Sequence, residues 1–508
     1  MDFIGIDVGT SSVKVLRTNE AGTVVATASR SYPLEQPCVG WTQQHPADWW
    51  RATVEAIRAV SGTEPIGGIG LSGQMHGLVL IDEIALKSDG SSDEVIRPAI
   101  LWNDQRTADE CAEIESALGG REACVNLTGN AALAGFTLPK LLWVRKHEPE
   151  LFSRAVTFMM PKDYIRWRLT GVVATDVGDA SGTLLFEPTC RRWSETAART
   201  FGIPHDFLPT VLESGSVCGQ VTPQASKLIG IKPGVPVITG SGDNMMGAIG
   251  AGIVAPGTSI ITIGTSGVVY SHTATYAIDV ADPAAPGRVH SMCAADGNSS
   301  SPGGWCVTGC TLASGGSLAW AKESVWPETS YEQLLHEASL APSGCEGLSF
   351  LPCLTGERCP YPNPRARGAW VGLTSVHNRG HMVRSILEGV AATLATIVAI
   401  QRSAGIHIDR FRIGGGGARI ALWRSILANE LGTAVSLPNT EEGPAFGAAL
   451  LAIASQTRCT DIRAICGALV RDTLTIEPGG GPSGNIERLN ACYHALHTRP
   501  SHARGVAP

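Results

Sequence analysis

The chain has 508 residues, of which 44% are hydrophobic and 17% charged, a composition typical of a globular protein with a large core. This length exceeds what one hydrophobic core usually supports, so we expect two domains. A formal net charge of −7 without a long basic run argues against binding to nucleic acid or to a membrane surface. Small molecules are therefore the expected partners.

The amino-terminal segment MDFIGIDVGT and the cysteines bear on the cellular compartment. Asp2 stands where a secretory signal peptide has basic residues, and no stretch of about 20 apolar residues follows. The 14 cysteines lack the close spacing of a disulfide scaffold, and Cys306 and Cys310 do not form a CxxC zinc motif. We therefore expect a cytoplasmic protein with reduced thiols.

The chain opens with β-rich runs in residues 3–32 that alternate with glycine turns and predict three antiparallel strands. The amphipathic stretch 45–60, HPADWWRATVEAIRAV, then predicts a helix, and 66–73, IGGIGLSG, predicts an apolar strand. This alternation indicates an α/β fold.

A second hairpin is predicted in residues 259–273, SIITIGTSGVVYSHT. Its GTSGV, starting at Gly264, echoes the GTSSV that starts at Gly9, at an offset of 255 residues. A repeat at half the chain length predicts two homologous lobes, although one short echo is a weak signal by itself.

Residues 411–432 predict a strand, a loop from Gly414 to Gly417, and a helix with Leu422, Ile426 and Leu427 on its apolar face. Further on, EPGGGPSG predicts irregular structure, and the terminal HTRPSHARGVAP predicts a frayed end.

The first turn places Asp7 at a strand end, before a glycine turn that carries Thr10 and Ser11. Backbone N–H groups in such a turn form a concave anion site, and the carboxylate can hold Mg²⁺ directly or through water. An ordinary hairpin turn is the alternative. The echo at Gly264, Thr265 and Ser266 favours two phosphate-binding turns, one in each lobe.

The predicted loop from Gly414 to Gly417 would let a nucleotide approach the backbone at Gly415 and Gly416. The chain has neither GxGxxG spacing in this loop nor a GxxxxGK[ST] motif, so no Rossmann or Walker loop is predicted here. A loop that serves only packing is the alternative.

Asp243, in VPVITGSGDNMMGAIGAG, follows an apolar strand at the predicted start of a helix. Phosphoryl transfer often uses a carboxylate to accept the proton of the attacking hydroxyl, and Asp243 is our candidate for this base. The alternative is a helix N-cap, a position that favours Asp. One residue can serve both roles.

Two further strand ends, GQMHG with Gln74, Met75 and His76 and LWND with Trp102, Asn103 and Asp104, carry polar side chains. Strand ends in α/β folds face ligand crevices. Amide, imidazole and carboxylate groups can bind several hydroxyls, and an indole offers a flat apolar face. This combination suits a sugar or polyol, although a single histidine such as His76 is more often structural.

Together these segments resemble the FGGY family of carbohydrate kinases over nearly the whole chain. DVGTSSVK is similar to the family's first phosphate loop, and GDNMMGA is similar to the segment with its catalytic aspartate. FTLPKLLWVRKHEPE and residues 368–388 resemble its two signatures. The resemblance implies two RNase-H-like, actin-like ATPase lobes of α/β class with a ligand cleft between them.

The resemblance also implies a role for each candidate residue. Asp243 would be the base, and Met75, His76 and Asp243 would contact the sugar, with Gln74, Trp102, Asn103 and Asp104 nearby. Asp7 and Asp243 would hold Mg²⁺, directly or through water. The residues expected to meet ATP are Thr10, Ser11, Lys14, Gly264, Thr265, Ser266, Gly415, Gly416 and Asn429.

GQMHG, LWND, PKDY and FLPCLTGERCPY resemble the branch of the family that phosphorylates D-xylulose. We expect transfer of the γ-phosphoryl group of ATP to the terminal hydroxyl of this ketopentose. The alternatives are a family kinase for another ketose or polyol, such as ribulose or a sugar alcohol, and a non-catalytic actin-like sensor. A homodimer would suit the family, but the sequence itself reveals no interface.

Some positions depart from the usual pattern of that branch. They are Met245 and Met246, which could narrow the sugar pocket, the stretch Cys359-Pro360-Tyr361, Ile420 after GGGAR, and the poorly matching segment 296–316. They leave the exact sugar open.

We divide the chain into an N-terminal lobe at 1–245, a C-terminal lobe at 246–455 and a terminal segment at 456–508.

Overall fold

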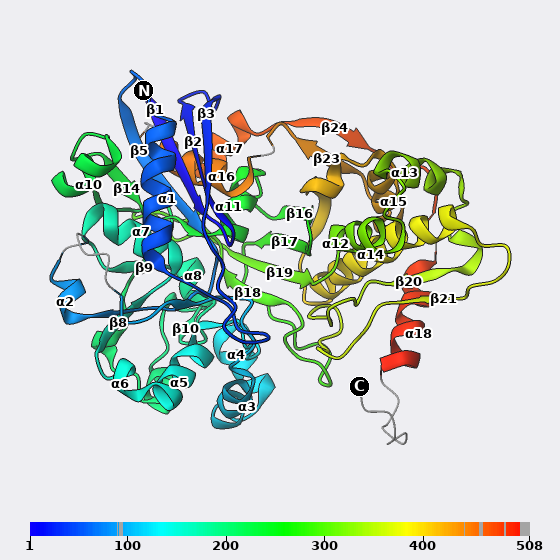
Figure 1. Cartoon of the computed structure of the whole chain (residues 1–508), viewed down its shortest axis with the longest axis horizontal. Helices are drawn as coiled ribbons and strands as arrows, with labels where there is room; N and C mark the ends of the chain where they lie inside the picture. Colours follow the sequence, from blue (N-terminus) through cyan, green and yellow to red (C-terminus); the bar gives the residue numbers. More distant parts are fainter. Residues whose placement is uncertain (89, 91–94, 441, 457–460, 482–483, 498–508) are drawn as a thin grey trace. The chain divides into compact units, whose positions relative to one another are not determined.

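The computed structural model describes the chain except for residues 89, 91–94, 441, 457–460, 482–483 and 498–508. The chain divides into two compact units, each assembled from separate stretches of sequence (Figure 1). The first unit comprises Met1–Pro256, His272–Val307 and Glu442–Arg471, and the second comprises Gly257–Ser271, Thr308–Glu441 and Asp472–Pro508.

The main sheet of the first unit has the strand order β13-β14-β5-β1-β2-β3, and β15 also pairs with β5. β1, β2 and β3 are successively antiparallel, whereas β5 is parallel to β1 and β14 is parallel to β5. The three antiparallel strands predicted at the start of the chain are therefore confirmed. The strands are β1 (Asp2–Val8), β2 (Ser12–Asn19), β3 (Val24–Ser31), β5 (Ile66–Gly73), β13 (Val217–Gln220), β14 (Pro236–Ile238) and β15 (Ser241–Gly242).

The second seven-stranded sheet has the order β18-β19-β17-β16-β22-β23-β24. β16 and β17 form the predicted second hairpin, and β22 and β23 add to it in parallel. Its strands are β16 (Gly257–Ile263), β17 (Gly267–Thr273), β18 (His290–Cys293), β19 (Trp305–Thr311), β22 (Ile408–Gly414), β23 (Val435–Pro438) and β24 (Asp472–Ile476).

The two sheets repeat one arrangement. A hairpin, a parallel strand, a second parallel strand and an antiparallel edge strand follow as β2-β1-β5-β14-β13 in one sheet and β17-β16-β22-β23-β24 in the other. This order confirms the two homologous lobes that the short sequence echo predicted.

Helices cover both faces of the first sheet. Alternate residues of a strand point to opposite faces, so β1 contributes side chains to both helical layers. Ile4, Ile6 and Val8 join the core formed with α1 (Pro46–Ala59) and α7 (Pro161–Thr170). Gly5 faces α16 (Gly443–Gln456), where an added Cβ would overlap the Ala445 carbonyl. Asp7 has the same parity as Gly5, so it belongs to the α16 face.

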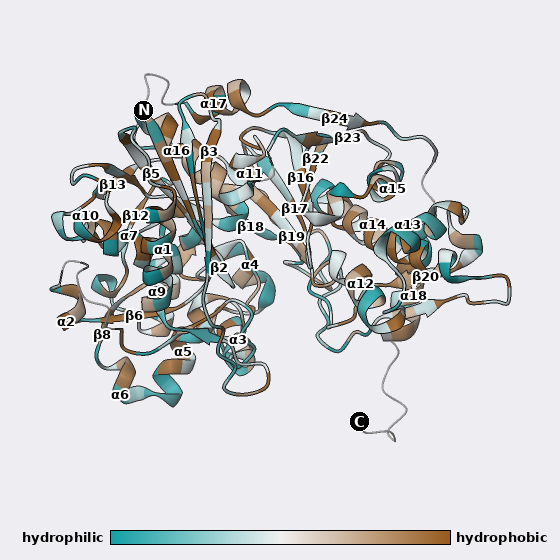
Figure 2. Cartoon of the chain, turned by 45° about the horizontal axis from the view of Figure 1, so that its top comes forward, coloured by the Kyte–Doolittle hydropathy of each residue, from teal (hydrophilic) through white to brown (hydrophobic). Residues whose placement is uncertain are grey.

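Helix α16 also packs against α11 (Asp243–Gly250) through small residues. Gly447 lies so close to the Met246 carbonyl that a Cβ there would overlap it, and Gly250 approaches the Gly443 carbonyl in the same way. Figure 2 shows the apolar character of α16 along this packing. This close packing holds the helix that begins with Asp243 on the same face of the sheet as Asp7.

In the second unit, β22 is followed by a glycine turn and by α15 (Ala421–Leu431), as predicted. The long helix α14 (Arg379–Ser403) forms the core beneath it, and Trp423 Nε1 donates to the Leu387 carbonyl at 3.0 Å. α14 is long and apolar enough to match a membrane span, but 89% of its most apolar window is buried inside the protein. We describe it as a core helix.

The remaining α-helices and β-strands complete the two units. In the first unit they are β4 (Gln43–Gln44), α2 (Glu83–Leu86), β6 (Val79–Asp82), β7 (Ala99–Ile100), α3 (Ala108–Ala117), α4 (Arg121–Thr128), α5 (Thr137–His147), α6 (Pro149–Phe152), β8 (Ala155–Met159), β9 (Ala174–Asp176), α8 (Val177–Ser181), β10 (Phe186–Glu187), β11 (Arg192–Trp193), α9 (Glu195–Phe201), β12 (Thr210–Leu212), α10 (Pro223–Ile229) and α17 (Ile462–Leu469). In the second unit they are α12 (Gly315–Trp320), α13 (Tyr331–Leu340), β20 (Ser349–Leu351), β21 (Ala369–Val371) and α18 (Asn485–His497).

The compact units are discontinuous, whereas the predicted division cuts the chain at residues 245 and 455. The stretch 246–455 supplies parts of both units, because α16 packs on the first sheet. The C-terminal part contains α17, β24 and α18 within 456–497, and the described residues of EPGGGPSG lie outside every helix and strand, as predicted. The predicted fraying of the end concerns residues 498–508, which lie outside the described part of the chain.

Candidate functional site

Three parallel strands of the first unit end side by side and carry the two carboxylates singled out in the sequence. Asp7 on β1 pairs with Ser72 on β5, and Ser72 pairs with Ser241 on β15. Asp243 follows β15 directly as the first residue of α11, whose N-cap is Gly242. The N-cap alternative for Asp243 is therefore wrong, and its carboxyl group belongs to the first helical turn.

The electrostatic setting of these carboxyl groups is unusual. Burial and, to a smaller extent, the negative charge of Asp7 raise the pKa of Asp243 to about 7, while a hydrogen bond from the backbone N–H of Asn244 acts to lower this pKa. Burial likewise raises the pKa of Asp7 to about 6, although the Ser72 hydroxyl, which donates to it at 2.9 Å, and Lys14 lower it. Two carboxyl groups that repel each other at a strand edge favour binding of a cation.

The chemistry of these two residues bears on the Mg²⁺ ion that the family resemblance implies. Oxygen ligands from carboxylates suit this hard cation, and both Asp7 and Asp243 retain some accessible surface. Mutual repulsion that raises a carboxyl pKa is relieved by a divalent cation. The donor set fits Mg²⁺, held directly or through water.

The turn that follows Asp7 is held from outside by side chains. Gly9 N donates to Ser12 O at 3.0 Å across the turn, and Tyr32 donates its hydroxyl to the Gly9 carbonyl. Trp102 Nε1 donates to Thr10 Oγ1 at 3.0 Å, which brings the LWND segment against the first phosphate-type turn. Ser11 is exposed at the tip of this turn.

Lys14, predicted to meet the nucleotide, forms an ion pair with Glu442, which immediately precedes α16. Both side chains are about one-third exposed, at 36% and 29%. An exposed pair of this kind is worth little energy, so a phosphate could compete with Glu442 for Lys14. Sequence reasoning missed Glu442, and no local signal pointed to it.

The GQMHG segment follows β5, next to Asp243. Met75 is buried, and its sulfur accepts a contact from Asn244 Nδ2 at 3.8 Å, so the residue after Asp243 touches this segment. His76 has a left-handed backbone with φ of 66°, and its Nδ1 lies 3.0 Å from the Gly182 carbonyl. The structure thus brings Met75, Asp243 and Asn244 together.

Other candidates have mainly structural contacts. Gln74 is buried and donates to Gln44 Oε1 at 3.1 Å. Asn103 accepts from the Thr42 hydroxyl at 2.7 Å. Asp104 is fully buried, pairs with Arg106 at 2.8 Å and accepts from Thr42 N at 2.6 Å. The predicted sugar contacts of these three residues stay predictions, and the structure gives each a role in holding loops.

The nucleotide candidates of the second unit gather around the β16–β17 turn. Gly264 N donates to Ser266 O at 3.0 Å, and the backbone of residues 314–316 donates to the carbonyls of Gly264 and Thr265. Gly415, with φ of 80°, lies so close that an added Cβ would be 2.6 Å from the Ile263 carbonyl. Asn429, farther along α15, accepts from Gly479 N at 2.9 Å and Gly480 N at 3.2 Å.

A buried charge cluster, which sequence reasoning did not assign, supports β15. Lys162, from the PKDY segment, contacts Asp163, Asp176 and Asp179 at 2.5–3.0 Å, and all four side chains are fully buried. Asp176 Oδ2 accepts from Ser241 Oγ at 2.6 Å, two residues before Asp243.

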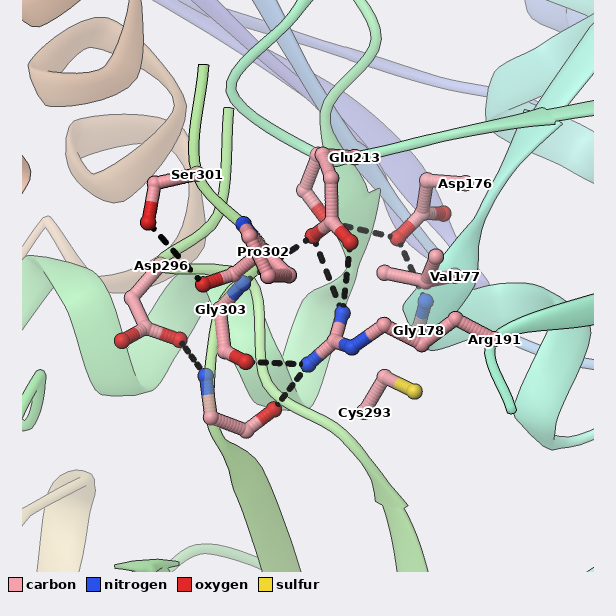
Figure 3. Close-up of polar contacts among 12 residues, drawn as sticks. Asp176, Val177, Gly178, Arg191, Glu213, Cys293, Asp296, Ser301, Pro302 and Gly303 are labelled. Carbon is pink, nitrogen blue, oxygen red and sulfur yellow. Dashed lines mark hydrogen bonds and ion pairs between the residues drawn. The ribbon is translucent and has the colours of Figure 1, made fainter. Parts of the chain in front are cut away.

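The same carboxylate is tied to a neighbouring network. Asp176 Oδ2 accepts from Gly178 N at 2.8 Å and Ser214 Oγ at 2.8 Å. Figure 3 shows Asp176 beside the pair formed by Arg191 and Glu213, in which Arg191 also donates to the Gly303 carbonyl. The sequence shows these charged residues in the segments PKDY and TDVGD, but only the tertiary structure brings the two segments together.

The departures from the family pattern lie in ordinary surroundings. Met245 and Met246 are buried in α11, and Cys359 is buried in the second unit. Ile420 is the residue before α15. The described residues contain no group of three or more His, Cys, Asp or Glu side chains arranged for a metal ion.

Comparisons with known proteins agree with this geometry. The N-terminal domain model of the FGGY family of carbohydrate kinases matches residues 3–250, and its C-terminal domain model matches residues 260–455. A curated relative, the xylulose kinase of Bacillus subtilis, is 40% identical over 500 residues, which cover 97% of this chain and 96% of the relative.

Two further relatives have similar coverage. The xylulose kinase of Escherichia coli is 36% identical over 454 residues, 89% of each chain. The solved structure of a xylulose kinase from Rhodospirillum rubrum is 30% identical, with a TM-score of 0.87 over 98% of this chain and 99% of that one.

Proposed function

Because this chain belongs to the FGGY family of carbohydrate kinases, we propose that it transfers the γ-phosphoryl group of ATP to the terminal hydroxyl of D-xylulose. The observation that carries this substrate is the 40% identity to a xylulose kinase across 97% of the chain. The reaction class follows from the family, and the cytoplasm, where ATP is abundant, is the proposed location.

Asp243 would accept the proton of the attacking hydroxyl. A general base works best when its pKa is near the working pH, and burial together with Asp7 raises that of Asp243 to about 7. Its place at the start of α11, beside Met75 and Asn244, supports contact with the sugar. The charge of Asp7 both increases the basicity of Asp243 and disposes the pair to bind a cation.

The two turns would hold phosphate by backbone N–H groups and hydroxyls. Thr10 and Ser11 offer these groups in the first unit, and Gly264, Thr265 and Ser266 offer them in the second. Lys14 would exchange Glu442 for a phosphate oxygen, and Gly415 and Gly416 would leave room for the nucleotide. Asp7 and Asp243 would hold Mg²⁺, which would neutralise negative charge on the transferred phosphoryl group.

An ADP-release assay with ATP and Mg²⁺ tests the substrate. The panel contains D-xylulose, D- and L-ribulose, L-xylulose, D-fructose, glycerol, gluconate and sugar alcohols. We expect the highest kcat/KM for D-xylulose. A higher value for another member would contradict the substrate but not the kinase reaction, and Met245 and Cys359 would be the first positions to change.

Asp243→Asn tests the base in the same assay. Removal of a general base typically lowers the rate about 10²–10⁴-fold, so we expect a loss of this size while ligand binding is kept. Calorimetric titration with D-xylulose checks binding. Near wild-type turnover by this variant would refute the role of Asp243.

A further inference from the structure

His76 has an unfavourable backbone conformation for a residue with a side chain. Its φ of 66° lies in the left-handed region that glycine adopts freely and other residues rarely occupy. Such strain persists only where the surroundings enforce it, and it is frequent at ligand sites. The contacts of His76 reveal what enforces it here.

The carbonyl of His76 is held by helix α5. Lys140 Nζ donates to the His76 carbonyl at 2.8 Å and to the Gly135 carbonyl at 2.7 Å. Thr137 Oγ1 approaches the His76 carbonyl at 3.4 Å. Lys140 is fully buried, which is a costly position for a charged side chain unless carbonyl dipoles or carboxylates compensate it.

The imidazole ring of His76 is held separately. Its Nδ1 lies 3.0 Å from the Gly182 carbonyl, and because a carbonyl only accepts, Nδ1 donates. In the neutral ring, Nε2 is then the accepting nitrogen. The ring centroid lies 4.5 Å from that of Phe136, and a Cβ at Gly182 would overlap the ring.

We infer that Lys140 is a positioning residue for sugar binding, which fixes the left-handed backbone of His76 so that the ring can accept a hydrogen bond from a sugar hydroxyl. This inference rests on the proposed function, in which His76 contacts the sugar. Lys140 itself does not touch the substrate. Its charge acts through the two carbonyls that it draws together, and the left-handed turn at His76 depends on that contact.

A double-mutant cycle of Lys140→Met and His76→Gly tests the inference in the kinase assay. Lys140→Met should raise the KM for D-xylulose about tenfold, the effect of one lost interaction of moderate strength, and leave the KM for ATP within about twofold. Glycine tolerates the left-handed turn without help. The double variant should therefore have a sugar KM no higher than that of His76→Gly alone.

Arg145→Met is the matched control on the same helix. Arg145 also donates to a backbone carbonyl, that of Phe201, at 2.6 Å, but it does not contact His76. We expect a wild-type sugar KM for this variant. If Lys140→Met does not fold, Lys140→Gln keeps an N–H donor and should give a smaller rise in the sugar KM.

Each outcome bears on the inference. Three outcomes would overturn it. The two substitutions could raise the sugar KM by factors that multiply in the double variant, Lys140→Met could raise the KM values for sugar and ATP equally, or a folded Lys140 variant could have an unchanged sugar KM. Failure of wild-type protein to phosphorylate D-xylulose would contradict the proposed function instead. The cycle would then be run with the sugar that the wild-type protein does phosphorylate, and the same outcomes would decide.

Discussion

The two hairpin turns of this protein share the sequence Gly-Thr-Ser but differ in what precedes and supports them. At the offset of 255 residues, Asp7 before the first turn corresponds to Thr262 before the second. The first turn therefore combines an anion-binding backbone with a carboxylate, whereas the second offers only neutral donors. If both turns bind phosphate as proposed, we expect a cation beside the first turn and none beside the second.

The turns also differ in length. Val8 pairs with Val13 around residues 9–12, while Ile263 pairs with Gly267 around residues 264–266, so the second turn is one residue shorter. Gly267 leaves no room for a Cβ, since Thr311, Leu394 and Ser314 lie within 3.1 Å of that position. The corresponding residue of the first hairpin is Ser12.

Support for the turns comes from different groups. Side chains of Tyr32, Gln44 and Trp102 donate to the first turn. Backbone N–H groups of residues 314–316 donate to the second. A sequence echo can thus preserve a binding turn while the surrounding contacts, and with them the chemistry, diverge.

The largest expected effect comes from making the first turn like the second. Asp7→Thr removes the carboxylate that raises the pKa of Asp243 and that would hold Mg²⁺. We expect kcat to fall roughly 10³-fold, the scale of losing one main electrostatic contribution at the reacting centre. Steady-state kinetics at saturating Mg²⁺ measures this.

Thr262→Ser is the matched control for that substitution, because it keeps the neutral hydroxyl before the second turn. It should retain kcat within about twofold, since the change leaves charge untouched. A kcat near the wild-type value for Asp7→Thr would remove the distinction between the turns.

A large effect on stability is expected for Gly415→Ala. The positive φ of 80° disfavours any side chain, and the new Cβ would lie 2.6 Å from the Ile263 carbonyl. We expect a loss of about 2–4 kcal/mol in unfolding free energy from strain and overlap, and a raised KM for ATP. Urea unfolding followed by circular dichroism measures the loss.

Gly416→Ala provides the stability control one residue later. No atom lies within 4 Å of its added Cβ, and its φ is not in the left-handed region. Its unfolding free energy should match that of the wild-type protein. Equal stability of both variants would show that the second turn does not depend on the close approach of Gly415.

The carboxyl pair predicts a pH dependence of stability without Mg²⁺ and nucleotide. Asp243 has a pKa raised from 3.8 to about 7, so the folded state binds a proton more tightly than the unfolded chain. Its contribution to stability is fully present below pH 3.8 and is lost as the pH rises through about 7.

Asp243→Asn tests this dependence because it removes the titration. As the pH rises from 3.8 to above 7, the wild-type Tm should fall relative to the Tm of the variant. Scanning calorimetry measures this difference. Parallel pH profiles of the two proteins would contradict the raised pKa. Asp7, with its pKa also raised by burial, contributes with the same sign and keeps part of the dependence in the variant.

The smallest effect is expected for Trp102→Phe, which removes the indole donor to Thr10 while it keeps an aromatic ring. A hydrogen bond contributes about 1 kcal/mol, so we expect about a fivefold rise in the KM for ATP. Trp193→Phe, which loses a donor to the Pro209 carbonyl, is the control and should leave this KM unchanged. An unchanged KM in Trp102→Phe would mean that the indole contribution to the support of the first turn is dispensable.

Local patterns in the sequence determined the two hairpins, the strand, glycine loop and helix of 408–431, and the strand ends that carry Asp7 and Asp243. These features follow from periodicity and from glycine and carboxylate positions over a few residues, which neighbouring residues encode. Tertiary contacts alone decided that α16 joins the first unit, where Gly5 and Gly70 of the sheet leave room for its backbone. They also decided that Asp104 is buried against Arg106 and that Lys140 holds His76, because pairing of distant charges and carbonyls has no periodic signal in sequence.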